Sequence, residues 1–181
     1  MKFDPAQHHR RSIRARGYDY SKPGAYFVTI CVNQHECLFG EVIGEAVQLN
    51  ECGKIVWDEW TKTPTLRPDI DLDVFVVMPN HLHGILIITD RRRGVLQYAP
   101  TFRSPSQTIG ALVRGFKSAV TKRINEMRNT PGVAIWQRNY YDHIVRNDDD
   151  LLRCRQYILD NPLKWELDEN HPDVFNGTSQ R

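Results

Sequence analysis

The sequence predicts an α+β domain in which helices cover an antiparallel sheet. Runs of β-branched and aromatic residues at 25–32, 74–78 and 81–89 predict strands. Apolar residues recur at helical spacing over 106–128, and a second helical pattern follows residue 147. At 181 residues, 40% of them hydrophobic and 25% charged, the chain suits one compact domain with its own core.

The chain divides into an arm, a domain and a tail. Residues 1–24 are rich in basic residues and turn formers, which predicts an irregular basic arm. The single folded domain is expected over 25–165, and a tail over 166–181. The sequence contains no internal repeat and no low-complexity linker.

A hairpin and a helix are expected after the first strand. Two short apolar runs, 37–43 and 46–49, flank a turn at Gly44-Glu45 and predict the hairpin. Asn50 is a suitable N-cap for a helix to about Lys62. Two prolines are expected to end this helix, Pro64 and Pro68.

The second half of the chain predicts two strands and two helices. An interrupted strand over 74–89 is followed by the helix 106–128 and by a strand over 134–146. Asn147 caps a last helix with an acidic first turn, which Pro162 stops. Four apolar residues of this helix are expected to pin it to the sheet: Leu151, Leu152, Ile158 and Leu159.

Composition excludes several classes of protein. No apolar run approaches the roughly 20 residues that span a bilayer, and the polar N-terminus lacks a signal-peptide stretch. A cytoplasmic location is therefore expected. The four cysteines show no Cys-x-x-Cys spacing, so the sequence suggests neither a disulfide framework nor a zinc ribbon.

Positive charge gathers in the first four fifths of the chain. Residues 148–181 hold 8 acidic and 4 basic residues, so of the totals of 22 and 24 the preceding part holds 14 and 20. Such clusters suit phosphate contacts, and they equally suit solvated surface. The candidate DNA contacts are Arg10, Arg11, Arg14, Arg16, Arg91, Arg92, Arg93 and Lys117.

Two histidines one residue apart stand in the strand 81–89. Successive side chains of a strand point to opposite faces, so His81 and His83 are expected side by side, with Leu82 directed into a core. Paired imidazoles on a rigid strand can fix two positions of a divalent metal. An isolated His-x-His is more often a pair of half-buried histidines with local hydrogen bonds, and the pattern alone leaves both interpretations open.

A tyrosine and an asparagine lie four residues apart in the last predicted helix. Tyr157 and Asn161 are expected on one helix face, about one turn from each other. The Asn161 amide oxygen could complete a metal site with His81 and His83, beside Tyr157. A cation on a scissile phosphate would help a tyrosine hydroxyl, a weak nucleophile with a pKa of about 10, to attack it. Spacing alone favours a core tyrosine and an ordinary helix-end asparagine.

Several ordered motifs resemble one family. His81-Leu82-His83 matches the His-hydrophobic-His signature of HUH endonucleases. Other segments are similar to the REP-associated tyrosine transposases, and together they span nearly the whole chain. These segments are His9–Arg14, Gly17–Tyr20, Met78–Gly84, Trp136–Arg146 and Tyr157–Pro162.

The resemblance implies a single-tyrosine enzyme with a ferredoxin-like core that cuts and joins single-stranded DNA through a 5′-phosphotyrosine. By position, Tyr157 matches the nucleophile, and His81 and His83 match paired ligands of Mg²⁺ or Mn²⁺. Asn161 matches the third ligand, where related insertion-sequence transposases commonly carry the longer glutamine. The resemblance further implies hairpin DNA of REP-like palindromes as partner, a monomer or homodimer, and a nucleoid-associated protein with no membrane contact.

Two other functions stay open from the residues. In the first, His81 and His83 hold a metal that activates water, and the protein hydrolyses phosphodiesters without using Tyr157. In the second, a DNA-binding regulator without catalysis uses only the basic surfaces. Tyr140 and Tyr141 are rival nucleophiles, but strand alternation sends them to opposite faces, so packing or base stacking is the preferred role.

Overall fold

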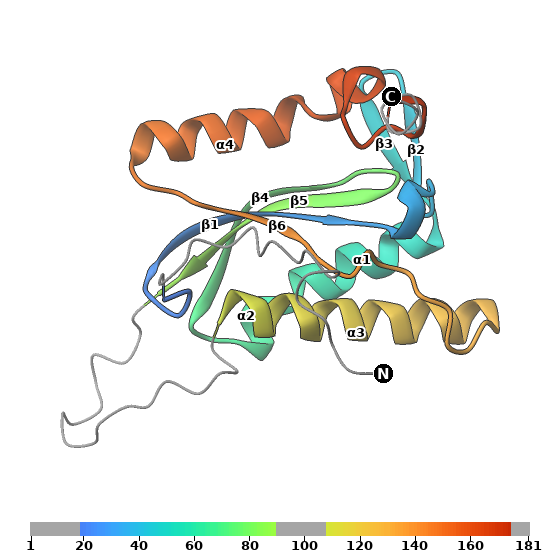
Figure 1. Cartoon of the computed structure of the whole chain (residues 1–181), viewed down its shortest axis with the longest axis horizontal. Helices are drawn as coiled ribbons and strands as arrows, with labels where there is room; N and C mark the ends of the chain where they lie inside the picture. The colour runs from blue at the N-terminus through green and yellow to red at the C-terminus, as the bar shows by residue number, and fades with distance from the viewer. Residues whose placement is uncertain (1–18, 90–107, 175–181) are drawn as a thin grey trace, which may run out of the picture.

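The centre of the computed structural model is a four-stranded sheet in the order β4-β5-β1-β6 (Figure 1). The structure describes residues 19–89 and 108–174. Every pairing in this sheet is antiparallel. The strands are β1 (Gly24–Cys31), β4 (Ile70–Val77), β5 (His81–Ile88) and β6 (Tyr141–Ile144). This is the strand order of a ferredoxin-like sheet, and the predicted α+β class is confirmed.

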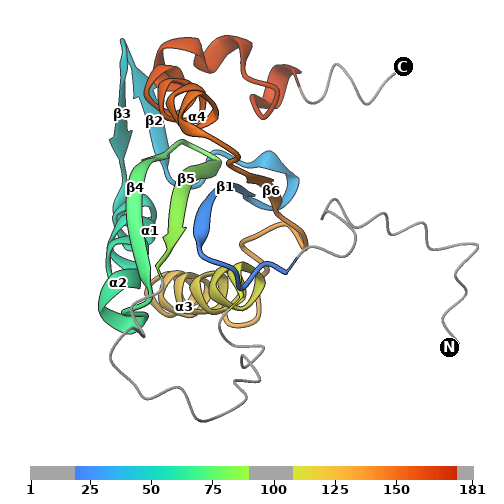
Figure 2. The ribbon, with the colours of Figure 1, turned by 90° about the vertical axis from the view of Figure 1, so that its left-hand side faces the viewer.

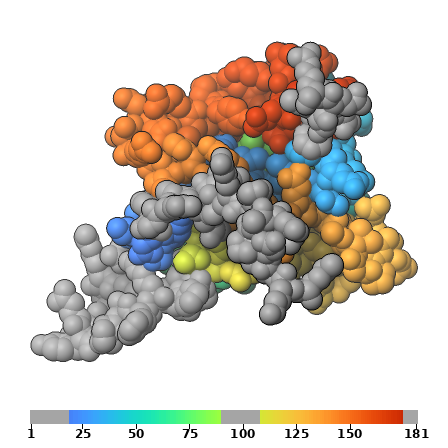
Figure 3. All heavy atoms as spheres, in the orientation of Figure 1, coloured from blue at the N-terminus to red at the C-terminus, as the bar shows by residue number. Residues whose placement is uncertain are grey.

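Helices cover both faces of the sheet. Three of them lie on one face: α1 (Glu51–Thr61), α2 (Thr63–Leu66) and α3 (Ile109–Arg128). The opposite face carries α4 (Asp148–Asp160), as Figure 2 shows from the side. In the space-filling view α4 forms a ridge along one edge of the molecule (Figure 3). None of the helices within 19–89 and 108–174 is long and apolar enough to cross a membrane.

Shorter elements join these layers. The predicted hairpin is present as β2 (Gly40–Ile43) and β3 (Ala46–Leu49), which form a separate two-stranded sheet. The 3₁₀ helix η1 (Asn33–His35) follows β1, and η3 (Pro162–Leu167) follows α4. Pro64 lies in the first turn of α2, where its missing N–H costs no helical hydrogen bond.

The larger core lies between the sheet and the helices α1 and α3. Leu82, between the two histidines, is fully buried in it, as the alternation of side chains predicts. Gly84 is also required there, because a Cβ at this position would lie 2.6 Å from Cζ2 of Trp60 in α1. The glycine therefore lets α1 pack closely under β5, one residue beyond His83.

A smaller core holds α4 against the other face. Ile158 is buried with Phe27 and Ile85, and Leu151 and Cys154 pack beside them. These helix positions recur at i, i+3 and i+7, so they share one face. The expected anchoring by Leu152 and Leu159 is wrong: they are 58% and 60% exposed, because they point away from that face.

An ion pair fixes α4 to the edge strand. The pairing of β4 with β5 is irregular between Leu72 and Phe75, and Asp73 lies within this irregularity. Its Oδ2 accepts a hydrogen bond from Nε of Arg155 at 2.9 Å and forms an ion pair with Nη2 at 2.7 Å. This charge-assisted contact holds α4 two residues before Tyr157.

The strand expected over 134–146 is much shorter. Only Tyr141–Ile144 form β6, and Trp136 makes an isolated bridge to Val32. The intervening carbonyls are satisfied differently: Lys117 Nζ donates to the backbone oxygens of Gln137 at 2.8 Å and Asn139 at 2.7 Å. A side chain of α3 thus replaces a strand partner.

Candidate active site

His81 and His83 lie side by side on β5, facing α4. They are 0% and 1% exposed, and their ring centroids are 4.4 Å apart. Nδ1 of His81 lies 2.8 Å from Oδ1 of Asn80, and Nδ1 of His83 lies 2.8 Å from Oγ1 of Thr29 on β1. Because Asn80 Oδ1 can only accept, His81 carries its proton on Nδ1 and offers the lone pair of Nε2.

Both imidazoles are held neutral. Burial lowers the pKa of His81 to about 4, although Asp168 and the Asn161 amide act in the opposite direction. Burial is the main cause that lowers the pKa of His83 well below its usual value, and the neighbouring His81 lowers it further. A neutral imidazole is the form that ligates metals, so both side chains are ready to bind a cation near neutral pH.

A chain of hydrogen bonds fixes the asparagine that ends α4. Asn161 Nδ2 donates to Oδ2 of Asp168 at 2.8 Å. Oδ1 of Asp168 accepts from the backbone N of Asn170 at 2.6 Å and from its Nδ2 at 2.9 Å. The chain continues to the histidines, because Asn80 Nδ2 donates to the Asn170 carbonyl at 2.7 Å and Asn80 Oδ1 contacts His81 Nδ1. All four side chains are buried.

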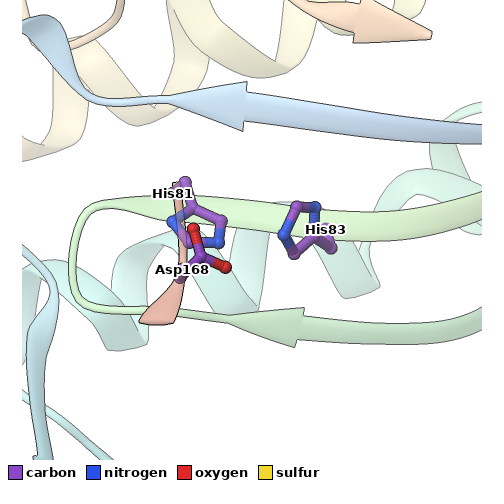
Figure 4. A group of neighbouring side chains, drawn as sticks. All are labelled: His81, His83 and Asp168. Carbon is purple, nitrogen blue, oxygen red and sulfur yellow. The ribbon is translucent and has the colours of Figure 1, made fainter. Parts of the chain in front are cut away.

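Three buried polar atoms near this network are placed to bind a divalent cation. His81 Nε2, His83 Nε2 and Asn161 Oδ1 are buried and have no hydrogen-bond partner among the described residues. Such atoms are costly unless something binds them. Figure 4 shows the Asp168 carboxylate beside His81, and ligand atoms of His81, His83 and Asp168 lie within 4.8 Å of one another. Two imidazoles, an amide oxygen and a nearby carboxylate form a donor set that can hold a divalent cation.

Tyr157 lies next to this cluster, one turn before Asn161 on α4. Its ring centroid is 5.1 Å from that of His83 and 5.9 Å from that of Phe27. Its side of the helix is open, and the residue is 44% exposed. Burial of the hydroxyl region and the charges of Asp168 and Glu169 raise the pKa of Tyr157 to about 12. The hydroxyl therefore stays protonated at neutral pH unless a cation or a base assists it.

The structure thus brings together His81, His83, Tyr157 and Asn161, the four residues that the family resemblance grouped in one site. The arginines predicted to contact DNA, at 10, 11, 14, 16 and 91–93, lie outside the described residues. Lys117 is half-buried and holds the 137–139 segment, and burial lowers its pKa to about 8. Of the rival tyrosines, Tyr141 is 46% exposed, whereas Tyr140 packs against the larger core.

Sequence reasoning missed Asp168 and Asn170. The expected boundary between domain and tail at 165/166 falls inside the packed segment that carries them, because η3 turns the chain back to the histidines. Trp165 of η3 anchors this return, with its ring centroid 6.0 Å from that of His81. The sequence offered only a weak signal for Asp168: it follows Asn161 by seven residues, after a turn of helix that begins with a proline.

A protein of Haemophilus influenzae, itself uncharacterised, is 41% identical to this chain over 179 residues, which is 95% of this chain and 98% of that protein. The chain belongs to the family of this Haemophilus protein. No family model matches the chain.

Solved structures show the shared fold. A REP-associated tyrosine transposase, solved bound to a REP hairpin, aligns with a TM-score of 0.52 and 21% identity, covering 84% of this chain and 73% of that one. A transposase candidate from Deinococcus radiodurans aligns with a TM-score of 0.47 and 17% identity over 80% of this chain and 94% of that one, which is too weak to show a shared fold. The chain therefore has the fold of the REP-associated tyrosine transposase.

Proposed function

We propose that this protein cuts and rejoins single-stranded, hairpin-forming DNA through a covalent 5′-phosphotyrosine at Tyr157. The observation that carries the proposal is a set of three buried atoms, His81 Nε2, His83 Nε2 and Asn161 Oδ1, which have no hydrogen-bond partner among the described residues and lie beside the ring of Tyr157. These residues would hold Mg²⁺ or Mn²⁺. When bound, the cation would neutralise charge on the scissile phosphate.

The chain's own residues supply the covalent chemistry. Oη of Tyr157 attacks the phosphorus and gives up its proton, and a new P–O bond links the tyrosine to the 5′ side of the cleaved strand. The bond to the 3′ oxygen breaks, and that oxygen leaves as a hydroxyl after taking up a proton. Because one phosphodiester replaces another, a second 3′ hydroxyl can reverse the reaction and rejoin the strand without ATP.

The DNA substrate is proposed from the shared fold. The structural neighbour of the same fold was solved with a REP hairpin, which supports hairpin DNA as the substrate class. Arginines at 10, 11, 14, 16 and 91–93 are proposed to contact phosphates, as predicted from the sequence. Lys117 is proposed to contact phosphate as well, while it holds the 137–139 segment.

The carboxylate of Asp168 favours one alternative. A hydrolase that activates water on the metal needs a general base, and Asp168 lies within 4.8 Å of both imidazoles. Its two oxygens already accept three hydrogen bonds, which leaves about one of the carboxylate's four acceptor positions for a base. The hydrolase also gives no role to Tyr157, whose ring centroid lies 5.1 Å from that of His83, so the tyrosine reaction fits the site better.

Covalent trapping separates these functions. The protein, with Mn²⁺ and end-labelled hairpin DNA from palindromic repeats of its own genome, is resolved on a denaturing gel. We expect a labelled protein–DNA adduct in wild type and none in Tyr157→Phe or His81→Ala. Cleavage without an adduct, surviving in Tyr157→Phe, would establish the hydrolase instead. Binding with neither product would favour a regulator.

A further inference from the structure

A cavity of about 640 Å³ lies beside Tyr157, on the side of the sheet that carries α4. Its volume is that of a typical small-ligand site. Phe27, Tyr141 and Tyr157 supply aromatic surface to its lining. Phe27 is buried, but Tyr141 and Tyr157 are 46% and 44% exposed. Two half-exposed tyrosines facing one cavity leave apolar surface that a ligand can cover.

The three rings are arranged as a floor with upright walls. The rings of Tyr141 and Tyr157 meet that of Phe27 at interplanar angles of 71° and 75°, with centroids 6.3 Å and 5.9 Å from it. Phe27 itself stacks on His83 at 5.5 Å. The floor of the cavity is thus in contact with the metal-site histidine, and one of its walls is the proposed nucleophile.

Polar groups line the rest of the cavity. Gln137 and Asn139 contribute amides, and Glu169 contributes a carboxylate. Arg153 lies one turn before Tyr157 on α4, lines the cavity, and has a side chain that is 75% exposed. Amides and carboxylates match the donors and acceptors on base edges, and a guanidinium matches a phosphate.

We propose that this cavity binds one unpaired nucleobase next to the cleaved phosphodiester, stacked on Tyr141. The inference rests on the proposed function and names the part of the DNA that the site holds. Unpaired bases are commonly held by stacking on aromatic side chains, and Tyr141 offers such a face next to the reacting tyrosine. Tyr141 is then a positioning residue: a base fixed on its ring places the adjoining phosphate at Tyr157.

The test uses binding, which requires no cleavage. A Tyr157→Phe background keeps the ring and removes the nucleophile. The probe is a hairpin from the genomic repeats with a single-stranded extension, in which 2-aminopurine is placed at successive unpaired positions. We expect strong quenching at one position, together with loss of that quenching in Tyr141→Ala. Affinity should fall about 5- to 150-fold, because stacking on an aromatic side chain contributes ~1–3 kcal/mol per base.

Matched variants keep the result specific. Tyr141→Phe retains the ring and should bind within about twofold of the background protein. Trp57→Ala removes an aromatic residue that is 45% exposed on α1, on the other face of the sheet, and should bind normally. Removing the quenched base from the DNA should cost as much as Tyr141→Ala, with no further loss when the two changes are combined.

Two results would overturn the proposal: unchanged affinity in a folded Tyr141→Ala protein, or additive losses from the variant and the abasic DNA. Either can occur while wild type still forms the covalent adduct, so base binding in the cavity can be rejected while the proposed function stands. Conversely, a stacked base without any adduct in wild type would leave the cavity in place and reject the tyrosine chemistry.

Discussion

Asn161 donates a hydrogen bond of 2.8 Å from Nδ2 to Oδ2 of Asp168, and this bond decides which end of the amide faces the histidines. A carboxylate only accepts, so the NH₂ group must turn toward Asp168 and the carbonyl oxygen away from it. Oδ1 is the atom left buried without a partner in the described part of the chain. Asp168 thereby orients the Asn161 amide so that its oxygen can serve as the proposed metal ligand.

Replacing Asp168 by asparagine should weaken metal binding about 10- to 100-fold, the usual effect of losing a group that orients a ligand. An amide at 168 cannot accept from both Asn161 and Asn170, so one of its contacts fails. Isothermal titration with Mn²⁺ measures the affinity. Asp173→Asn is the control, because the Asp173 side chain is 92% exposed. An affinity equal to that of wild type would show that Asp168 does not orient the site.

Mn²⁺ should raise the thermal stability of the wild-type protein, and His81→Ala or His83→Ala should abolish this increase. A ligand that binds only the folded state at 100 times its Kd stabilises by about 2.7 kcal/mol. Thermal melts with and without Mn²⁺ provide the measurement. His171→Gln, which changes a histidine outside the metal cluster, should keep the increase. A shift that persists in both alanine variants would place the metal elsewhere.

Acid should destabilise the metal-free protein. The folded pKa of His81 is about 4, against 6.5 in the unfolded chain, so the unfolded state takes up more protons between these values. Stability is then constant above about pH 7 and falls as the pH drops from 6.5 toward 4, with about 2 kcal/mol lost by pH 5 through His81 alone. Urea unfolding at pH 7.5 and pH 5 tests the slope. His81→Gln should reduce this slope without abolishing it, because burial also holds the pKa of His83 below its usual value, and an equally steep loss in that variant would contradict the assignment.

Asp73→Asn should lower both stability and the rate of adduct formation. The Asp73–Arg155 contact is partly buried and charge-assisted, so its loss should cost roughly 1 kcal/mol and loosen α4 near Tyr157. Urea midpoints and single-turnover rates are compared with Lys164→Gln, which breaks an exposed pair with Asp160 and should change stability by less than about 0.5 kcal/mol. A normal rate in Asp73→Asn would mean that other contacts position Tyr157.

The sequence predicted the parts of the site that lie on regular elements. The alternation of a strand placed His81 and His83 together, and helical spacing placed Tyr157 and Asn161 on one face. The caps of α1 and α4 were also readable, since Asn50 and Asn147 each accept from a backbone N–H three residues on. These rules are local, so one sequence suffices to apply them.

The remaining parts depend on contacts between distant segments. Asp168 joins the site because η3 folds back onto β5, and no pattern within 162–170 indicates that return. The helix stripe of α4 was misjudged at Leu152 and Leu159, because a leucine can lie on either face and only the position of the sheet decides. A distant contact also explains why β6 is short. Lys117, twenty or more residues away, donates to the carbonyls of Gln137 and Asn139, which a longer strand would otherwise pair.

The most direct test of the central claim is to identify the residue that carries the DNA. The trapped adduct is digested with nuclease and protease, and the modified peptide is sequenced by mass spectrometry. The account predicts a nucleotide attached to Tyr157, through its 5′ phosphate, in a reaction that requires Mn²⁺ or Mg²⁺. A nucleotide on Tyr140 or Tyr141, or an adduct that forms equally well in His81→Ala, would contradict it.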